Sequence, residues 1–456
     1  MKPKTLINNA KFISVFCLIL GIVVTSITFS AWATQHAING GPRFTKTIRT
    51  AILEISRFPS NLKSVVGLLR NYLPPKGDVN KYKCLDRLVV KDESLSGGVI
   101  ISALNSNGFH QVMMLNLASK TGCVIFENKN LRNLTVYSDV LPNSESRRQS
   151  AIQSRNRVWH PNLSKTGLLV YCIPWNDLVA VDLKTGSEKW RVRGAFHHSI
   201  EVDDDGDYWV CGAAEPTQIS NGETSIMLNT LFFEDQIIAK ISKDGKIIKS
   251  LSVSSLLVKS GLEYLLFGAA NPLTNFDPIH LNQISPILRD SGVFKKGQIL
   301  ISLRNISTVV LLDPETEKVC WHKIGPWMNQ HSVVPIGPSV FSILDNHSFA
   351  SGNYWIDSGW KSKVILHDIN LGTSKETVLT EYLSENLKIP IEGRVLPMAD
   401  GGWILEDCYY GTLIVIKNGN IAYKWSNLYP DGTVGITSWC RFISAKEMAE
   451  YKCLLQ

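Results

Sequence analysis

The residues best suited to chemistry in this sequence are histidines and arginines that recur at one phase of a strand pattern. His331 opens a strand-like segment just after another such segment has turned back, so its imidazole can point out of a sheet into a cleft. His160, His198 and His280 precede or open similar segments. Arg394 does the same near the end of the chain. A lone histidine on a strand is usually a packed core residue, but its recurrence at one phase favours a shared site.

Arg304 lies at the end of an apolar run that starts at Ile301. A guanidinium is costly to bury without an anionic partner, and its planar fork suits a tetrahedral oxyanion such as sulfate or phosphate. An internal salt bridge with a strand Asp or Glu is the alternative. Zinc competes for the histidines because imidazole is a common zinc ligand. The histidines are far apart in sequence, however, and no neighbouring acidic pattern supplies a fourth ligand, so we predict an anion site and no metal.

A repeated hairpin indicates which elements position these residues. From about Cys84 onward, short β runs alternate Val, Ile, Tyr and Trp with polar residues, and Lys-Thr-Gly, Asp-Gly or Asn-Gly turns separate the runs. One unit recurs six times: an apolar strand, an Asp or equivalent, a glycine turn, and a second strand that often ends in Trp. Its copies lie at 112–126, 178–190, 237–248, 309–321, 364–372 and 413–425.

Such a hairpin cannot bury both of its faces alone, so repetition at this period predicts stacked sheets. Four-stranded blades around a channel are the usual solution for all-β repeats of this length. We therefore predict an all-β fold, a six-bladed β-propeller; a β-sandwich with accidental hairpin similarity is the alternative. The innermost strand of each blade would start at one rim of the channel, so the basic residues that open these strands would converge on the axis.

The N-terminal segment predicts export. Residues 12–33 carry no charge and three lysines precede them, which predicts a cytoplasmic N-terminus at 1–11 and a single transmembrane anchor at 12–33. The sequence Ala31-Trp-Ala33 also fits the cleavage site of a secretory signal peptide. Residues 34–80 have apolar positions at helical spacing and predict a helical stalk, which leaves 81–456 for the propeller, in the periplasm or outside the cell.

Composition narrows the partners further. The chain has 47 Lys and Arg against 40 Asp and Glu, a net charge of +7 that is scattered along the sequence, so nucleic acid is not expected. The cysteines show no C-x-x-C metal spacing. Cys172, Cys211 and Cys320 lie in strand-like segments, where buried free thiols are common. Cys84 and Cys453 flank the predicted domain and could pair.

A chain of short motifs resembles a known family. The motifs keep the order and spacing seen in the bacterial arylsulfate sulfotransferases, and the resemblance covers about residues 160–440. They are His280-Leu-Asn282, Ser302-Leu-Arg304-Asn305, Trp321 with Gly325, Gln330-His331 and Asp345-Asn346. The resemblance implies a six-bladed propeller that moves a sulfuryl group from one phenol to another by a ping-pong route, without a phosphoadenylyl cofactor or any other.

The resemblance also implies roles for single residues. His331 is expected to be the nucleophile that becomes transiently sulfated, and His280 with Arg304 to hold the sulfuryl oxygens. His198, or its neighbour His197, is expected to be the remaining active-site histidine. A histidine near the leaving phenolate can donate a proton and later take one from the acceptor phenol. The residues expected to bind substrate are His197, Asn282, Asn305, His160 and Arg394.

The expected partners are a small aryl sulfate and a phenol, the membrane through the N-terminal anchor, and a second copy of the chain in a homodimer. Trp327, Tyr354 and Trp355 could line a phenol pocket, although such residues more often pack in a core. Two other functions stay open: a non-catalytic propeller that binds an acidic glycan or a protein partner in its basic channel, and a sulfatase-like hydrolase with water as acceptor. A nucleophile beside an anion clamp favours the transferase, because a binding channel needs no nucleophile.

Overall fold

The chain divides into two compact units, Met1–Lys76 and Gly77–Gln456, and the elements below belong to the second. The computed structural model describes residues 88–90, 95–106, 109–119, 121–128, 158–214, 219–220, 225–226, 233–269, 277–351, 354–356, 361–386, 389, 391–398, 401–430 and 434–455. The predicted anchor at 12–33, the stalk at 34–80, Cys84 and the Cys453 side chain lie outside this part, so these predictions stay untested. None of the helices in the described ranges is long and apolar enough to cross a membrane.

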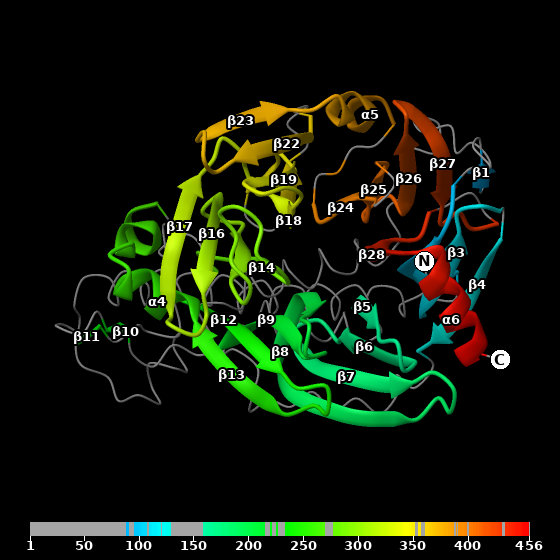
Figure 1. The fold of residues 1–456 in the computed structure, drawn as a ribbon, viewed down its shortest axis with the longest axis horizontal. Helices are drawn as coiled ribbons and strands as arrows, with labels where there is room; N and C mark the ends of the chain where they lie inside the picture. The colour runs from blue at the N-terminus through cyan, green and yellow to red at the C-terminus, as the bar shows by residue number, and fades with distance from the viewer. Residues whose placement is uncertain are drawn as a thin grey trace, which may run out of the picture. The chain divides into compact units, whose positions relative to one another are not determined.

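The described part is mostly antiparallel β-sheet (Figure 1). One sheet has the order β28 (Thr437–Ile443), β2 (Gly98–Leu104), β3 (His110–Asn116), β4 (Gly122–Glu127). A seven-stranded sheet has the order β5 (Trp159–Leu163), β6 (Leu168–Cys172), β7 (Asn176–Asp182), β8 (Glu188–Val202), β9 (Tyr208–Ala214), β12 (Asp235–Ile241), β13 (Ile247–Ser252). A third sheet has the order β14 (Leu281–Pro286), β15 (Ile299–Leu303), β16 (Thr308–Asp313), β17 (Lys318–Ile324).

Two further large sheets follow along the chain. The first has the order β18 (His331–Pro335), β19 (Val340–Asp345), β22 (Lys363–Asp368), β23 (Thr373–Glu376). The second has the order β24 (Arg394–Pro397), β25 (Trp403–Asp407), β26 (Thr412–Lys417), β27 (Asn420–Ser426), β1 (Leu88–Val90). The smaller elements are the hairpins β10/β11 (Ile219–Ser220, Ser225–Ile226) and β20/β21 (Phe349–Ser351, Tyr354–Ile356), the helices α4 (Val253–Lys259), α5 (Leu379–Asn386) and α6 (Ala445–Leu455), and the π-helix η3 (Leu265–Ala269).

All six predicted hairpins are present. They are the antiparallel pairs β3/β4, β7/β8, β12/β13, β16/β17, β22/β23 and β26/β27. Their turns use the expected glycines: Gly186 and Gly245 have φ of 67° and 80°, a region that glycine enters without a steric cost. The apolar alternation and the turn residues together therefore determined these elements locally.

The sheets form a propeller-like arrangement around six inner strands, which we call the first strands. Strands β28, β5, β8, β14, β18 and β24 contact one another in this order, and β24 contacts β28 in turn, so the series closes on itself (Figure 1). The sheet count differs from the six separate blades predicted, because the described residues form five large sheets. The reason is that β8 runs for 15 residues, pairing with β7 along its first part and with β9 along its second.

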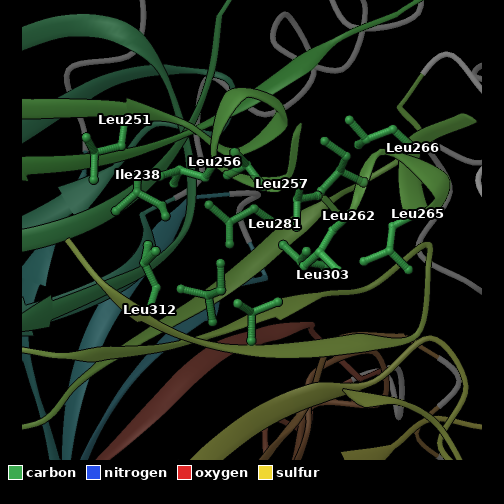
Figure 2. Close-up of a cluster of buried hydrophobic side chains, with 14 of the residues drawn as sticks. Ile238, Leu251, Leu256, Leu257, Leu262, Leu265, Leu266, Leu281, Leu303 and Leu312 are labelled. Atoms are coloured by element: carbon green, nitrogen blue, oxygen red, sulfur yellow. The ribbon is translucent and has the colours of Figure 1, made fainter. Parts of the chain in front are cut away.

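The hydrophobic core lies between consecutive sheets. Both faces of β15 are buried: Ile299, Ile301 and Leu303 enter one cluster, and Leu300 enters another. Such two-sided burial explains why its sequence is apolar at every position but Ser302 rather than alternating. Figure 2 shows the first of these clusters, where leucines of α4 pack against side chains from β12 and β14.

The first strands are also joined by hydrogen bonds between side chains and backbone. Each neighbouring pair of these strands has at least one such bond, and we call the set the polar girdle. An inner strand has no backbone partner on its channel side, so these bonds satisfy part of an open sheet edge. The pairs are Ser438–His160, Asn162–Ile200, Ser199–Ile284, Ser285–Val333, Ser332–Val395 and Arg394–Cys440.

The cysteines only partly follow the prediction. Cys172 and Cys211 are buried free thiols, as expected. Cys320 is exposed, because β17 is the last strand of its sheet and leaves one face to solvent. The prediction of burial at Cys320 was therefore wrong.

Candidate active site at the hub

Bulges in the first strands bring the basic residues together. The register shifts by one residue in β5, β18 and β28 and by two in β8, and one non-glycine residue within each shift has φ near +50°. These residues are His160, His198, Ser332 and Trp439. A bulge turns neighbouring side chains away from the usual strict alternation, and non-glycine residues in the left-handed region concentrate at functional sites. His280, directly before β14, has the same conformation with φ of 54°.

We use the word hub for His160, His197, His198, His280, Arg304 and His331. The ring of His198 lies at its centre: its centroid is 4.9 Å from that of His280, 5.8 Å from that of His160 and 6.4 Å from that of His331. The structure thus brings together four histidines that are spread over more than 170 residues of sequence. Arg304 and His280 both act electrostatically on His331 and lower its pKa, although burial is the larger cause.

A hydrogen bond to Asn346 determines the tautomer of His331. The two atoms joined are His331 Nδ1 and Asn346 Oδ1, 2.7 Å apart. Asn346 uses its amide nitrogen to donate to the carbonyls of Ile389 and Glu392, at 3.0 and 2.8 Å, so its oxygen must face the imidazole. His331 therefore carries its proton on Nδ1 and donates it, which leaves the lone pair on Nε2. Burial keeps the ring neutral by holding its pKa well below the ordinary value.

The peptide before His331 is also held in place. Asn282 donates from Nδ2 to the carbonyl of Gln330 at 2.7 Å. The Gln330 side chain donates to Ser302 Oγ and to the carbonyls of Leu303 and Thr308. Asn282, predicted to bind substrate, thus has a direct contact that positions the segment carrying His331.

His280 is oriented by a carboxylate. Asp277 Oδ2 accepts a short hydrogen bond from His280 Nδ1, and Asp277 Oδ1 accepts from the His280 backbone amide at 3.0 Å. A carboxylate on one ring nitrogen fixes the tautomer and orients the imidazole. Asp277 was not singled out from the sequence, although its position three residues before His280 was visible.

Arg304 is buried, with 7% of its surface exposed. Its Nη1 donates to Asn305 Oδ1 at 2.5 Å, and Asn305 Nδ2 donates to the Asp277 carbonyl at 2.6 Å. Burial lowers the Arg304 pKa to about 10, so the guanidinium is still charged at neutral pH. Asn305 therefore links the predicted anion clamp to the segment that orients His280.

His197 and His198 contact each other through the same ring atom. The two Nδ1 atoms lie 2.7 Å apart, and both rings are buried. The His197 ring also lies 4.0 Å from the ring of Trp175, and the His198 ring lies 4.7 Å from that of Trp159. Burial, followed by the charge of His280, lowers the pKa of His198 well below its ordinary value.

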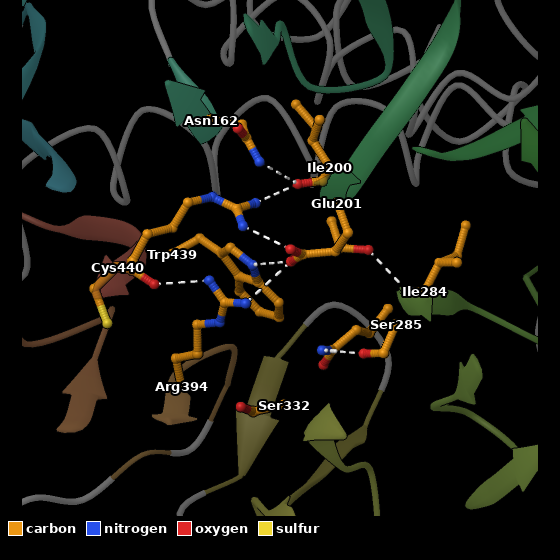
Figure 3. Close-up of polar contacts among 12 residues, drawn as sticks. Asn162, Ile200, Glu201, Ile284, Ser285, Ser332, Arg394, Trp439 and Cys440 are labelled. Atoms are coloured by element: carbon orange, nitrogen blue, oxygen red, sulfur yellow. Dashed lines mark hydrogen bonds and ion pairs between the residues drawn. The ribbon is translucent and has the colours of Figure 1, made fainter. Parts of the chain in front are cut away.

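His160 and Arg394 both contact the ring of Trp439. The His160 ring stacks on the indole at 4.2 Å, and the Arg394 guanidinium lies 4.5 Å from the indole centroid. Arg394 also donates to Glu201 Oε1 at 3.0 Å, and Arg441 donates to Glu201 Oε2 at 2.6 Å (Figure 3). Glu201 thus accepts from the buried guanidinium of Arg394 and the partly buried one of Arg441, on two different strands, an ion-pair network that sequence reasoning missed.

Aromatic residues line the hub, whereas Trp327 takes the core position that was the favoured interpretation of its sequence. Trp327 is 2% exposed and packs in a core cluster with Phe341. The side chains of Tyr354 and Trp355 lie outside the described part. The aromatic rings that do contact hub imidazoles are Trp159, Trp175 and Trp439. Two of them, Trp159 and Trp439, lie at bulges, and the only sequence signal was their place at the start of first strands.

A group of potential metal ligands is found elsewhere in the described residues. Asp203, Asp205 and Asp207 could place carboxylate oxygens around one cation, at the turn between β8 and β9. Lys240 Nζ already lies 2.9 Å from Asp203 and 3.5 Å from Asp207. The prediction that the protein uses no metal stays a prediction.

The fold and the hub define a class: a β-propeller-like protein whose first strands bring imidazoles and a buried guanidinium to one place. A family model described as Arylsulfotransferase (ASST) matches residues 173–426. The chain belongs to this arylsulfotransferase family, as its motifs had indicated.

Solved structures give weaker similarities. A protein of unknown function from Bacteroides caccae has 11% identity, with a TM-score of 0.45 and coverage of 76% of this chain and 99% of the other. A streptogramin B lyase has 10% identity, a TM-score of 0.38 and coverage of 78% and 97%. Virginiamycin B lyase from Staphylococcus aureus has 11% identity, a TM-score of 0.37 and coverage of 73% and 85%. None of the curated proteins matches the chain.

Proposed function

We propose that this protein transfers a sulfuryl group from an aryl sulfate to a phenolic acceptor through a sulfohistidine at His331, without a phosphoadenylyl cofactor. The observation that carries the proposal is the hydrogen bond between His331 and Asn346, because it leaves the Nε2 lone pair of a neutral imidazole available. Membership of the arylsulfotransferase family supports the same reaction class. We also propose that the fold counts as six blades when the two halves of β8 are assigned to separate ones.

In the first step, His331 Nε2 would attack the sulfur of the bound aryl sulfate. The bond between sulfur and the phenolic oxygen would break, and the phenolate would leave with a proton from a hub imidazole, for which His198 is the candidate. In the second step, an acceptor phenol would give up its proton and attack the sulfur, so that the bond between nitrogen and sulfur breaks. Two easier transfers thereby replace one difficult transfer.

Arg304 and His280 would hold the sulfuryl oxygens during both steps. Charge develops on the equatorial and leaving oxygens of such a transition state, so preorganised donors in a buried site are the main source of acceleration. The buried guanidinium and the Asp277-oriented imidazole fit this role. Arg394, by contrast, already contacts Glu201 and Trp439, so we propose that it supports the hub rather than the substrate.

The purified full-length chain, incubated with 4-nitrophenyl sulfate, tests the proposal. Without phenol we expect a stoichiometric burst of nitrophenol, one per chain, and with phenol we expect continuous release. His331→Ala should abolish both. His322→Ala is the matched control, because His322 lies on β17 and bonds to Tyr264 at the surface, so it should leave both intact.

Other outcomes would support the alternatives. Equal continuous release with and without phenol would indicate hydrolysis. No release under either condition would favour a non-catalytic module that binds an acidic glycan or a protein partner. Attachment to the membrane through residues 12–33, with the catalytic unit outside the cytoplasm, is part of the proposal, and fractionation of cells that express the full chain tests it.

A further inference from the structure

The contact between His197 and His198 has a definite protonation requirement. A neutral imidazole has one N–H and one lone pair, so two Nδ1 atoms at 2.7 Å must share a single proton between them. If His197 donates, His198 has its own proton on Nε2. If His198 donates, its Nε2 is bare. The position of the shared proton therefore decides whether His198 Nε2 is an acid or a base.

A strand without a bulge could not make this pair, because consecutive residues point to opposite faces. On β8 the register shifts between His197 and Ile200, and His198 has φ of 54°, so both rings turn to one side. The bulges of β5, β18 and β28 carry other pairs at these two positions: Trp159–His160, His331–Ser332 and Ser438–Trp439. Among the described first strands, only β8 places an imidazole at both.

The surroundings of the two rings differ in a way that matters for charge. Each element packed against His198 contributes a titratable group: His160 of β5, His197 of β8, His280 before β14 and His331 of β18. A positive charge on any of these four rings disfavours a second proton on His198. The ring of His197 instead lies 4.0 Å from Trp175, whose π face favours a cation. An additional proton is therefore held better on His197 than on His198.

We propose that His197 and His198 act as one two-ring acid–base unit, in which His198 exchanges a proton with the substrate oxygen and His197 holds the compensating proton. The inference rests on the proposed sulfuryl transfer. His198 is the catalytic residue in this scheme, and His197 is a positioning residue that acts through it.

The protons balance in both transfers. Before the first, the pair is a cation with three N–H groups: two on His197 and one on His198 Nε2. His198 Nε2 gives its proton to the leaving phenolate oxygen as the bond to sulfur breaks, and the shared proton moves from His197 Nδ1 to His198 Nδ1. The pair is then neutral and His198 Nε2 is a base. The acceptor phenol returns a proton to Nε2, the shared proton moves back to His197, and the new phenolate attacks the sulfur.

His197→Asn tests the unit, because the asparagine side chain can bond to His198 Nδ1 but cannot hold the extra proton. With phenyl sulfate as donor, whose phenolate needs a proton to leave, we expect single-turnover sulfation of His331 to slow about 100-fold. With 4-nitrophenyl sulfate, whose leaving group is stable as an anion, we expect a loss under about 10-fold. His367→Asn is the matched control: His367 is buried on β22 and its Nδ1 lies 2.9 Å from Ser374 Oγ, so both rates should stay unchanged.

A proton inventory, in which the rate is measured at several fractions of D2O, distinguishes the two-ring unit from a purely structural role of His197. The wild-type rate with phenyl sulfate should curve with the fraction of D2O because two protons move, and the His197→Asn rate should vary linearly. An equal loss with both donors, or a straight line for the wild type, overturns the proposal. If His197→Asn does not fold, the wild-type inventory alone decides.

A binding measurement tests the two-ring unit without any catalytic turnover. Calorimetric titration of the full-length chain with inorganic sulfate, in two buffers of different ionisation enthalpy, should show proton uptake by the wild type and a smaller uptake by His197→Asn. Equal uptake overturns the unit, and so does the absence of sulfate binding. A chain that takes up the proton but transfers no sulfuryl group would retain the unit and refute the proposed reaction.

Discussion

Replacing Asn346 by alanine should slow the chemistry of His331 and also lower the stability of the fold. The substitution removes the acceptor that holds the His331 proton on Nδ1 and the donors to the carbonyls of Ile389 and Glu392. Without the acceptor, the proton can move to Nε2, which blocks the nucleophilic lone pair, and the ring loses its fixed orientation.

The contacts of Asn346 set the size of the effect. Leaving a buried donor without its acceptor costs about 1–3 kcal/mol. If that cost falls on the reactive tautomer, sulfation of His331 should slow about 5- to 150-fold. The free energy of unfolding should fall by a similar amount, about 1–3 kcal/mol. The carbonyl of Ile389 keeps a second donor, the Ser362 hydroxyl at 2.8 Å.

Ser362→Ala is the matched control. The Ser362 hydroxyl donates to the carbonyls of Asn346 and Ile389, so its loss disturbs the same segment without touching the bond to His331. Rapid-mixing measurements of the nitrophenol burst, together with urea denaturation, should show that Ser362→Ala loses about 1 kcal/mol of stability while its burst rate stays within about twofold. A burst rate for Asn346→Ala near that of the wild type, or an equally slow Ser362→Ala, would refute the tautomer argument.

The remaining predictions concern charge. Asp277→Asn should slow transfer about 10- to 100-fold in steady-state assays, because His280 loses the carboxylate that orients it; an unchanged rate would contradict that role. Glu201→Gln should lower the free energy of unfolding by about 3–5 kcal/mol, since it removes the carboxylate that pairs with the buried Arg394 and the partly buried Arg441. Glu188→Gln, on the exposed part of the same strand, should cost under about 1 kcal/mol in the same urea titration, and equal losses would refute the contrast. Burial lowers the pKa of His160, so the unfolded chain takes up a proton below about pH 6.5 that the folded chain resists, and stability should fall as pH drops through that range. His160→Phe should flatten this slope by up to about 1.4 kcal/mol per pH unit in thermal or urea unfolding, and an unchanged slope would contradict the assignment.

The hairpins and the recurrence of basic residues could be predicted from the sequence because both are local. A glycine at the turn and an apolar alternation determine a hairpin without reference to the rest of the chain, and all six were found. Basic residues at the same period marked five of the six first strands, and β28 was not among them. The joining of two predicted blades into one sheet through β8 could not be predicted. It depends on β8 continuing as one strand through residues that could equally have ended it.

The directions in which the side chains point, and the residues that they contact, could not be predicted from the sequence. The strand phase treats His331 and His198 as equivalent, yet His198 occupies the left-handed position of its bulge and His331 precedes the corresponding residue, Ser332. The partner of Arg394 is Glu201, 193 residues away, and no local pattern connects them. An internal salt bridge was predicted only as an alternative for Arg304, whereas the ion pair of Arg394 with Glu201 was not predicted at all.

The order of strands in the first sheet has a consequence for biogenesis. Its innermost strand, β28, is the last strand of the described part, while β2, β3 and β4 come from near its start. Until the ribosome has made Thr437–Ile443, the ring has a gap and no Trp439 is present to stack on His160. Pairing between such distant segments is slow to form, so a partly synthesised chain would remain an open arc with exposed sheet edges. The hub can therefore assemble fully only after β28 has been synthesised.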